Sequence, residues 1–260
     1  TRKDLKNNIV KEISGVKSEN IIAEPSGKNT APAIGLVAAL LGLTEPDTVM
    51  GVFPADHLIV GHRAFSKAIN TADRLAKKGD NLVTIGIRPT NPSTAYGYIQ
   101  YDDADEKGYL GAHHVKTFAE KPHEKLANRF IKSGDFLWNA GIFVWQINTL
   151  LTSMKKHMPE LYDTLITIRA HIESSKSIDK LWDSITPQSI DYGLMEKANN
   201  IAAERMGQIG IDIRARLDFG SALKVLNKLI PYEISWVEEP IQFENVDVLG
   251  KLANKTNILS

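Results

Sequence analysis

The sequence predicts an α/β protein with a doubly wound sheet. Two short apolar runs, residues 49–53 and 81–87, have the length and composition of buried strands of a parallel sheet. Between them, residues 64–78 carry apolar side chains at the spacing of an amphipathic helix. Strands that alternate with helices in this way are typical of an open sheet, and right-handed crossovers bring the strand ends to one edge.

The composition restricts the class of protein. A chain of 260 residues can bury a large core, in one large domain or in two smaller ones. Basic and acidic residues balance at 31 each, which argues against a surface for nucleic acid or anionic lipid. The absence of cysteine excludes disulfides and thiolate metal sites. No run is long enough to span a membrane and no signal peptide is present, so we expect a cytoplasmic protein. The sequence begins with Thr1 rather than Met, and we expect an N-terminal piece to be missing.

The first candidate for ligand binding is a helix N-terminus. Residues 20–25 are expected to form a short strand that ends at a proline. A nearly all-apolar helix follows, with Asn29 or Thr30 as its cap and Pro32 in its first turn. Free amides at such an end, beside Lys28, favour anionic or polar ligand groups. An ordinary capped helix is the alternative interpretation.

Asp56 is the second candidate. The apolar run 49–53 stops at Pro54, so Asp56 would lie just past the carboxyl end of a strand, where open α/β sheets bind ligands. A carboxylate in that position could bind Mg²⁺ through oxygen. The alternative is that Asp56 caps the following helix.

The middle of the chain holds further polar candidates. Gly97 lies within the β-rich segment 94–101. A glycine inside a strand usually marks the close approach of a ligand or another backbone. Glu120 and Lys121 end a returning strand. Because adjacent strand residues face opposite sides, we expect no ion pair between them, and a solvated charge pair is the alternative to a binding role. Asn139 lies in a strongly apolar strand, where its amide must find a hydrogen-bond partner.

The remaining pattern is mostly helical. No pair of histidines has the spacing of zinc ligands, so no metal-binding histidine is assigned. Helices are expected over residues 4–13, 124–133, 150–157, 160–172, 178–184 and 190–198.

Six short segments of residues 1–201, taken together and in their order along the chain, form a specific pattern, although each segment alone would be a weak signal. They are residues 24–33, 54–59, 96–99, 118–122, 136–143 and 190–197. Together they resemble the sugar nucleotidyltransferase family, in particular the bacterial mannose-1-phosphate guanylyltransferases. The resemblance implies a Rossmann-like nucleotidyltransferase domain, with an incomplete mixed sheet and helices on both faces.

The resemblance also implies a reaction and roles for the candidate residues. The phosphate of mannose 1-phosphate would attack the α-phosphate of GTP, giving GDP-mannose and pyrophosphate, with Mg²⁺ as cofactor. Asp56 would be a Mg²⁺ ligand and Lys121 would meet the sugar phosphate, which makes these two the expected catalytic residues. The expected nucleotide-binding residues are Asn29, Thr30, Ala31, Pro32 and Ala33, and the expected sugar contacts are Gly97, Glu120, Lys121 and Asn139.

Two departures from the family pattern concern the triphosphate and the metal. The Gly-rich loop that grips the triphosphate is not found, nor is the Trp-Ser-Asp segment that would follow Lys197 with a second metal-binding Asp. Residues 206–258 have a βαβα pattern instead and resemble a barrel fragment of the enolase superfamily, in its mandelate racemase and sugar-acid dehydratase branch. Asp212 and Glu238, 26 residues apart, match two of that barrel's three Mg²⁺ ligands. Two βα units cannot close a barrel, so we expect no tight metal there.

The sequence therefore predicts a hybrid of two domains, a nucleotidyltransferase domain at 1–201 and a barrel fragment at 206–260. Three functions stay open. The first is a guanylyltransferase impaired by the missing segments, with GTP and mannose 1-phosphate as partners. The second is a non-catalytic module that binds a sugar phosphate or nucleotide. The third is a fragment of a dehydratase or racemase. An oligomer is compatible with each of them.

Overall fold

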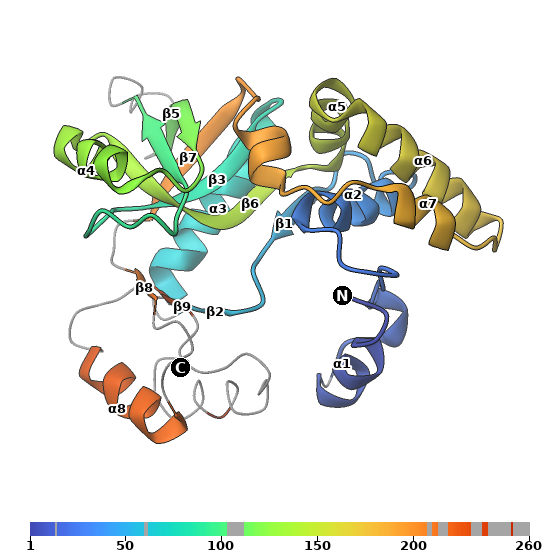
Figure 1. The fold of residues 1–260 in the computed structure, drawn as a ribbon, viewed down its shortest axis with the longest axis horizontal. Helices are drawn as coiled ribbons and strands as arrows, with labels where there is room; N and C mark the ends of the chain where they lie inside the picture. Colours follow the sequence, from blue (N-terminus) through green and yellow to red (C-terminus); the bar gives the residue numbers. More distant parts are fainter. Residues whose placement is uncertain are drawn as a thin grey trace.

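The computed structural model describes residues 1–13, 15–59, 62–102, 112–206, 210–212, 218–229, 236–238 and 251. A six-stranded mixed sheet lies at its centre, with helices on both faces and a small second sheet nearby (Figure 1). The strands of the central sheet are β1 (Val49–Val52), β3 (Leu82–Ile87), β4 (Tyr98–Tyr101), β5 (Ala112–Ala119), β6 (Phe136–Gln146) and β7 (Ile201–Met206).

Strand β6 organises the central sheet, whose order is β1-β6-β3-β7-β5-β4. β6 runs antiparallel to β1, β3 and β4, whereas β3 and β7 are parallel. The predicted mixed sheet with helices is thus confirmed. The prediction that residues 49–53 form a buried strand of a parallel sheet is wrong, because β1 is an edge strand, only partly buried and antiparallel to β6. A short apolar run does not reveal its pairing direction, since the partner strand lies far away in the sequence.

Helices cover both faces of this sheet (Figure 1). On one face lie α2 (Thr30–Leu41) and α5 (Ile147–His157), with α6 (Pro159–Glu173) packed against both and α7 (Asp179–Ser184) against α6; on the other face lie α3 (His62–Lys78) and α4 (Glu124–Ser133). Alternate residues of β6 face the two helical layers on opposite sides of the sheet. Phe143 and Trp145 pack with α2 and α5, while Ile142 and Val144 pack with α3. The apolar character of β6 follows from this burial on both sides.

The N-terminal segment differs from expectation in one element. Helix α1 (Lys6–Glu12) is present, and a 3₁₀ turn (Ser18–Asn20) follows it. The strand predicted at residues 20–25 is wrong, since the backbone there forms a single isolated bridge between Arg2 and Glu24. An extended apolar segment becomes a strand only where a sheet edge is available to it.

The C-terminal segment forms a βαβ unit from β8 (Gly210–Asp212), α8 (Phe219–Leu229) and β9 (Trp236–Glu238). β8 and β9 are parallel, and β9 also pairs antiparallel with β2 (His57–Ile59), so the second sheet has the order β2-β9-β8. The part of the expected βαβα pattern that follows β9 lies outside the described residues, apart from residue 251. The barrel fragment is not confirmed.

Helices in the described part of the chain are too short or too polar to cross a membrane. The division of the chain into domains at 1–201 and 206–260 stays a prediction. β7 joins the central sheet, and β9 attaches the tail to β2.

Candidate active site

The candidate site lies at one edge of the central sheet. β1 and β3 both run antiparallel to β6, so their carboxyl ends reach the same edge, next to Asn139 in the first half of β6. Asp56 follows β1, and Gly97 directly precedes β4. Glu120 and Lys121 follow the last residue of β5. Residues that are up to 83 positions apart in the sequence thus meet at one place.

Two adjoining hollows occupy this edge. The Asp56 hollow has a volume of about 220 Å³ and is lined by Asp56, Gly97, Glu120, Lys121 and Asn139, among others. The Asn29 hollow has a volume of about 430 Å³, and its lining includes Asn29, Thr30, Gln188 and Tyr192. Glu120, Lys121 and Asp191 line both hollows. Seven of the residues expected from the sequence therefore surround one continuous region.

The N-terminus of α2 does not offer the free amides that the sequence suggested. Asn29 is the cap, as predicted, and its Oδ1 accepts from the Thr30 amide at 2.7 Å. The Ala31 amide donates to the Gln188 carbonyl at 3.0 Å. Lys28 is turned away, donating from Nζ to the Asp183 carbonyl at 2.9 Å. The expectation of free amides beside a lysine is wrong, because residues near 188 pack across the helix end.

The first two residues of the predicted nucleotide-binding segment line the Asn29 hollow, and the other three are not among its lining residues. Asn29 and Thr30 are exposed there, whereas Ala31 and Pro32 are buried within the first turn of α2 and Ala33 is partly buried. Thr30 also accepts the Ile190 amide on its hydroxyl at 2.9 Å. Ala31 and Pro32 therefore support the helix end from inside.

Two lining residues have an unusual backbone. Asn29 has φ 72° and Lys121 has φ 45°. Asn tolerates positive φ, but it is uncommon for Lys, and residues held in such conformations cluster at functional sites. The turn at Lys121 brings its Nζ to 3.7 Å from Glu120 Oε1. The expectation of no ion pair between these neighbours is wrong, because the chain has already left the extended strand.

Asn139 is held in one orientation by a hydrogen-bond network. The Thr84 hydroxyl donates to Asn139 Oδ1 at 2.9 Å, and the Gly141 amide donates to the same atom at 3.1 Å. Asn139 Nδ2 in turn donates to Asp191 Oδ1 at 2.9 Å. The prediction that this amide must find partners is confirmed, and the network leaves the side chain facing the Asp56 hollow.

Asp191 and Glu196 are site residues that the sequence reasoning did not single out. Asp191 begins η3 (Asp191–Met195), a π-helical turn, and Glu196 directly follows it and donates from its amide to the Asp191 carbonyl at 2.9 Å. Glu196 Oε1 accepts from the Glu120 amide at 3.0 Å. π-Turns are frequent at functional sites. The available signal was the position of both residues in the sixth family-like segment, 190–197.

The electrostatics of the site centre on Glu120. Burial, followed by the negative charges of Asp191 and Glu196, raises the pKa of Glu120 to about 7, against the opposing effect of Lys121. Burial also raises the pKa of Asp191. Near neutral pH, Glu120 can therefore either donate or accept a hydrogen bond.

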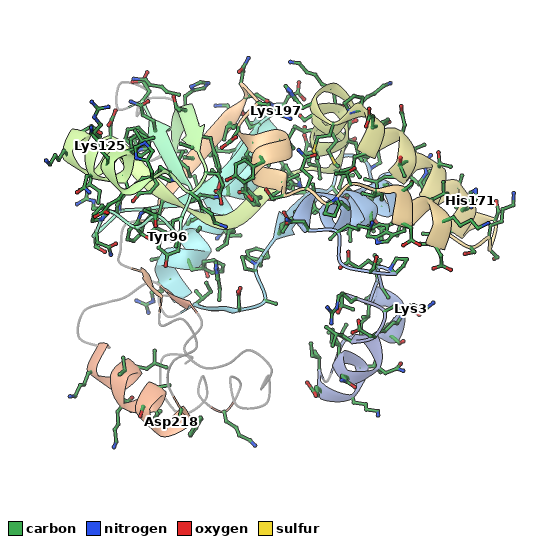
Figure 2. The ribbon with its side chains drawn as sticks, in the orientation of Figure 1. Lys3, Tyr96, Lys125, His171, Lys197 and Asp218 are labelled. Carbon is green, nitrogen blue, oxygen red and sulfur yellow. The ribbon has the colours of Figure 1, made fainter. Side chains whose placement is uncertain are left out.

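The space that a side chain at Gly97 would need is occupied by Glu120. A Cβ at Gly97 would overlap Glu120 Oε2 and would lie 3.4 Å from Asn139 Cβ. The close approach that the sequence predicted at Gly97 is thus that of a neighbouring side chain. Tyr96, labelled in Figure 2, lines the Asp56 hollow and packs on Trp138 with ring centroids 4.9 Å apart. It adds an aromatic wall that the sequence reasoning missed.

Asp56 lies in the turn between β1 and β2, partly exposed, and lines the hollow that bears its name. β2 separates it from α3, so the alternative that Asp56 caps that helix is excluded. Among the described residues no group of three or more His, Cys, Asp or Glu side chains could hold a metal ion. Mg²⁺ often needs only one or two carboxylates beside substrate phosphates and water. The donor chemistry of Asp56 fits one such ligand.

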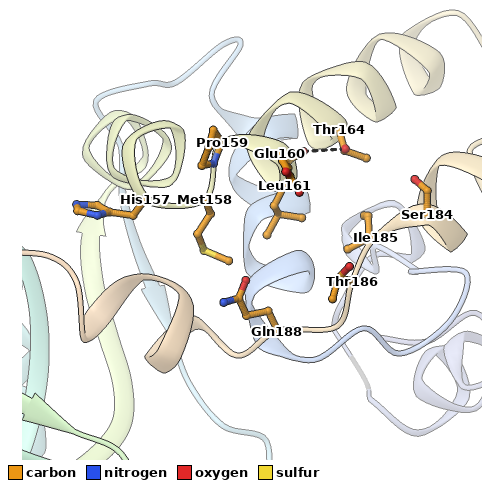
Figure 3. Close-up of a pocket in the computed structure, with 10 residues that line it drawn as sticks. All are labelled: His157, Met158, Pro159, Glu160, Leu161, Thr164, Ser184, Ile185, Thr186 and Gln188. Carbon is orange, nitrogen blue, oxygen red and sulfur yellow. Dashed lines mark hydrogen bonds between the residues drawn. The ribbon is translucent and has the colours of Figure 1, made fainter.

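A third hollow adjoins the site (Figure 3). Its volume is about 340 Å³, and it lies between the corner of α5 and α6 and the chain at residues 184–188. Met158, Leu161 and Ile185 form its apolar part, and Gln188 lines both this hollow and the Asn29 hollow. It extends the cleft beyond the residues expected from the sequence.

Asp212 and Glu238, the expected remnants of an enolase-type site, end two neighbouring strands. They are partners in the parallel register of β8 and β9, and Glu238 is also opposite His57. Their side chains lie outside what the structure describes, so the expectation of two metal-ligand remnants without a tight metal stays a prediction.

The fold and the hollows define an α/β domain with a ligand-binding cleft at the edge of a mixed sheet. The nucleotidyl transferase family model matches residues 2–185, so the chain belongs to the nucleotidyl transferase family. The resemblance of residues 206–258 to the enolase superfamily has no support from the comparisons with known proteins.

Two curated relatives are similar to most of this chain. An Escherichia coli protein named mannose-1-phosphate guanylyltransferase is 35% identical over 194 residues, which cover 72% of this chain and 42% of the relative. The alginate biosynthesis protein AlgA of Pseudomonas fluorescens is 37% identical over 186 residues, which cover 70% of this chain and 38% of the relative. The chain thus spans about two fifths of the length of these relatives.

Solved structures agree with the fold. One from Thermus thermophilus, titled mannose-1-phosphate geranyltransferase, matches with a TM-score of 0.69 at 25% identity, covering 82% of this chain and 65% of that one. One from Helicobacter pylori, titled mannose-6-phosphate isomerase, matches with a TM-score of 0.66 at 31% identity, covering 79% of this chain and 80% of that one.

Proposed function

We propose that this chain is part of a protein that transfers a guanylyl group from GTP to mannose 1-phosphate, and that the Asp56 hollow binds the sugar phosphate. Family membership and the names of the curated relatives support the reaction class. The observation that carries the proposal is the meeting of Glu120, Lys121 and Asn139 at one edge of the sheet. Two hydrogen-bonding groups beside one cation suit a ligand that has both hydroxyls and a phosphate.

Each residue has a role that follows from its surroundings. The Lys121 side chain is 59% exposed, so its ammonium can move from Glu120 to a ligand phosphate as a point charge. Glu120, only 10% exposed, and the oriented amide of Asn139 bind sugar hydroxyls. Gly97 leaves the space in which Glu120 lies. Asn29 and Thr30, at the far side of the adjoining hollow, contact the nucleotide.

The chemistry needs no nucleophile from the protein. An oxygen of the sugar phosphate forms a bond to the α-phosphorus of GTP while the bond from that phosphorus to the bridging oxygen breaks, and pyrophosphate leaves with the electron pair. The chain contributes positioning by Asn139 and Glu120 and charge neutralisation by Lys121. Mg²⁺, held by Asp56 with phosphate oxygens and water, would neutralise further charge on the phosphates.

The test is calorimetry of the 260-residue chain with mannose 1-phosphate and GDP-mannose. We expect both to bind, and Lys121→Met to weaken binding by about tenfold to a hundredfold, because a hydrogen bond to a charged group contributes about 1.5–3 kcal/mol. Lys125→Met is the matched control, since Lys125 lies exposed on α4 and lines neither hollow (Figure 2). Absence of binding to the parent chain would refute the proposal.

A second assay separates transfer from binding. The chain is incubated with GTP, mannose 1-phosphate and Mg²⁺, and pyrophosphate release is measured. Release that is lost in Lys121→Met supports guanylyl transfer by this chain. Binding of the sugar phosphate without release supports the alternative, a module that binds sugar phosphate or nucleotide.

A further inference from the structure

Asp191 occupies the position where the two hollows meet. It is the first residue of η3 and lines both the Asp56 hollow and the Asn29 hollow. The segment that leads into it is tied to α2 through the Gln188 carbonyl and the Ile190 amide. The backbone before Asp191 is therefore held against α2, and the Glu196 amide donates to the Asp191 carbonyl at 2.9 Å on the other side. A fixed backbone of this kind is a requirement for a precise binding residue.

The hydrogen bonds of Asp191 leave acceptor capacity in the cleft. Its Oδ1 accepts from Asn139 Nδ2, and a backbone hydrogen bond also reaches the carboxylate. An ionised carboxylate can accept about four hydrogen bonds. Its charged neighbours are Glu120 and Glu196, which repel it, and Lys121, which attracts it. A partly buried carboxylate in these surroundings gains when a ligand supplies a further O–H donor.

The direction of each hydrogen bond also fits a double role. Thr84 and Gly141 both donate to Asn139 Oδ1, so the Asn139 amide must present its NH₂ group toward Asp191. Asp191 can then orient Asn139 with one oxygen and keep the other for a ligand. Glu120 lies across the same hollow, so a ligand between them would be contacted by two acids and one amide.

We propose that Asp191 is a sugar-binding residue, with one carboxylate oxygen orienting Asn139 and the other accepting a hydrogen bond from a sugar hydroxyl. The ligand class is a polyhydroxylated sugar phosphate rather than phosphate alone. This inference rests on the proposed function, because it places the same ligand in the same hollow. It adds a specificity-determining contact from η3, whereas the other sugar-side residues lie in or next to strands of the central sheet.

The experiment compares Asp191→Asn with Asp191→Ala by calorimetry with mannose 1-phosphate. Asp191→Asn keeps an oxygen that can accept from Asn139 Nδ2 but replaces the other oxygen with a donor. We expect Asp191→Asn to lose at least tenfold in affinity, close to the loss in Asp191→Ala. Inorganic phosphate should bind both variants at least as tightly as it binds the parent chain, since Lys121 is untouched and a negative charge beside it is removed. Asp163→Asn, an exposed site on α6, is the control.

Deoxy analogues of mannose 1-phosphate identify the hydroxyl. The parent chain should bind the analogue that lacks the hydroxyl contacted by Asp191 more weakly than mannose 1-phosphate. Asp191→Asn should bind that analogue and mannose 1-phosphate equally well, because its contact to the hydroxyl is already lost. If Asp191→Asn binds mannose 1-phosphate as well as the parent chain does while Asp191→Ala does not, Asp191 only orients Asn139 and the inference is overturned, although the proposed function stands. If the parent chain binds no mannose 1-phosphate, the proposed function fails and this inference fails with it.

Discussion

Glu120→Gln should make the protein more stable above neutral pH. Glu120 lies only 10% exposed among Asp191 and Glu196, and its pKa is raised to about 7, chiefly by burial. Gln has nearly the same shape but never carries the charge. The variant therefore removes the cost of burying an ionised carboxylate, a cost that a binding site accepts for function.

The size and sign follow from linkage. In the unfolded chain Glu120 titrates near its ordinary value of 4.5, and in the folded chain its pKa is about 7. Between these pH values the folded chain keeps its proton while the unfolded chain releases it, so the contribution to stability is full below 4.5 and is lost as the pH rises through 7. At about 1.4 kcal/mol per pH unit, the shift sets an upper limit of about 3 kcal/mol on the loss in the parent chain at about pH 8, and solvent screening of this partly buried group lowers it.

Urea denaturation of parent and variant at about pH 5 to 8 measures the effect. We expect the two free energies of unfolding to be within about 1 kcal/mol at the acid end and the variant to be more stable by about 2–3 kcal/mol at the alkaline end. Glu173→Gln, an exposed carboxylate at the end of α6, should show no such divergence. A parent chain that is as stable as Glu120→Gln at the alkaline end would show that the carboxylate is not destabilised by its surroundings.

Two further changes test the packing around the site. Gly97→Ala should displace the Glu120 carboxylate, because a Cβ would overlap Oε2. We expect calorimetry to show at least a tenfold loss of affinity for mannose 1-phosphate, with the affinity for inorganic phosphate unaffected. An unchanged affinity for mannose 1-phosphate would contradict the geometry. Trp182→Phe should destabilise the chain by about 2 kcal/mol in urea denaturation, because the fully buried indole donates to the Ser26 carbonyl at 2.7 Å. A loss below about 0.5 kcal/mol would mean that the site repacks around the smaller ring.

Elements with strong local signals were predictable from the sequence. Helix α4 has the predicted bounds and ends at Gly134, whose φ of 80° is the left-handed conformation that glycine adopts at helix ends. Asn29 caps α2 with its own side chain. β3 is buried along its whole length, as its apolar composition indicated. Each of these features depends on residues within a few positions of one another.

Features that depend on distant partners were not predictable in the same way. β1 was expected in a parallel sheet, but its register with β6 makes it an antiparallel edge strand. The ion pair of Glu120 and Lys121 depends on the positive φ of Lys121, which the residue types there do not predict. The Ala31 amide at the start of α2 donates to the carbonyl of Gln188, 157 residues later, and the Thr30 hydroxyl accepts from the Ile190 amide.

By itself, the sequence determined most of the helices and the buried strand β3, which family residues 1–201 resemble, and which residue types stand at the strand ends. Periodicity, caps and prolines act over a few residues, so they can be recognised without the fold. Only the tertiary structure decided that Asp191 and Glu196 join Glu120 in one cluster and that β9 pairs with β2 beside Asp56. The physical reason is that pairing direction, hydrogen-bond partners and burial of charge are set by contacts between distant segments, whose free energy exists only once the sheet has formed.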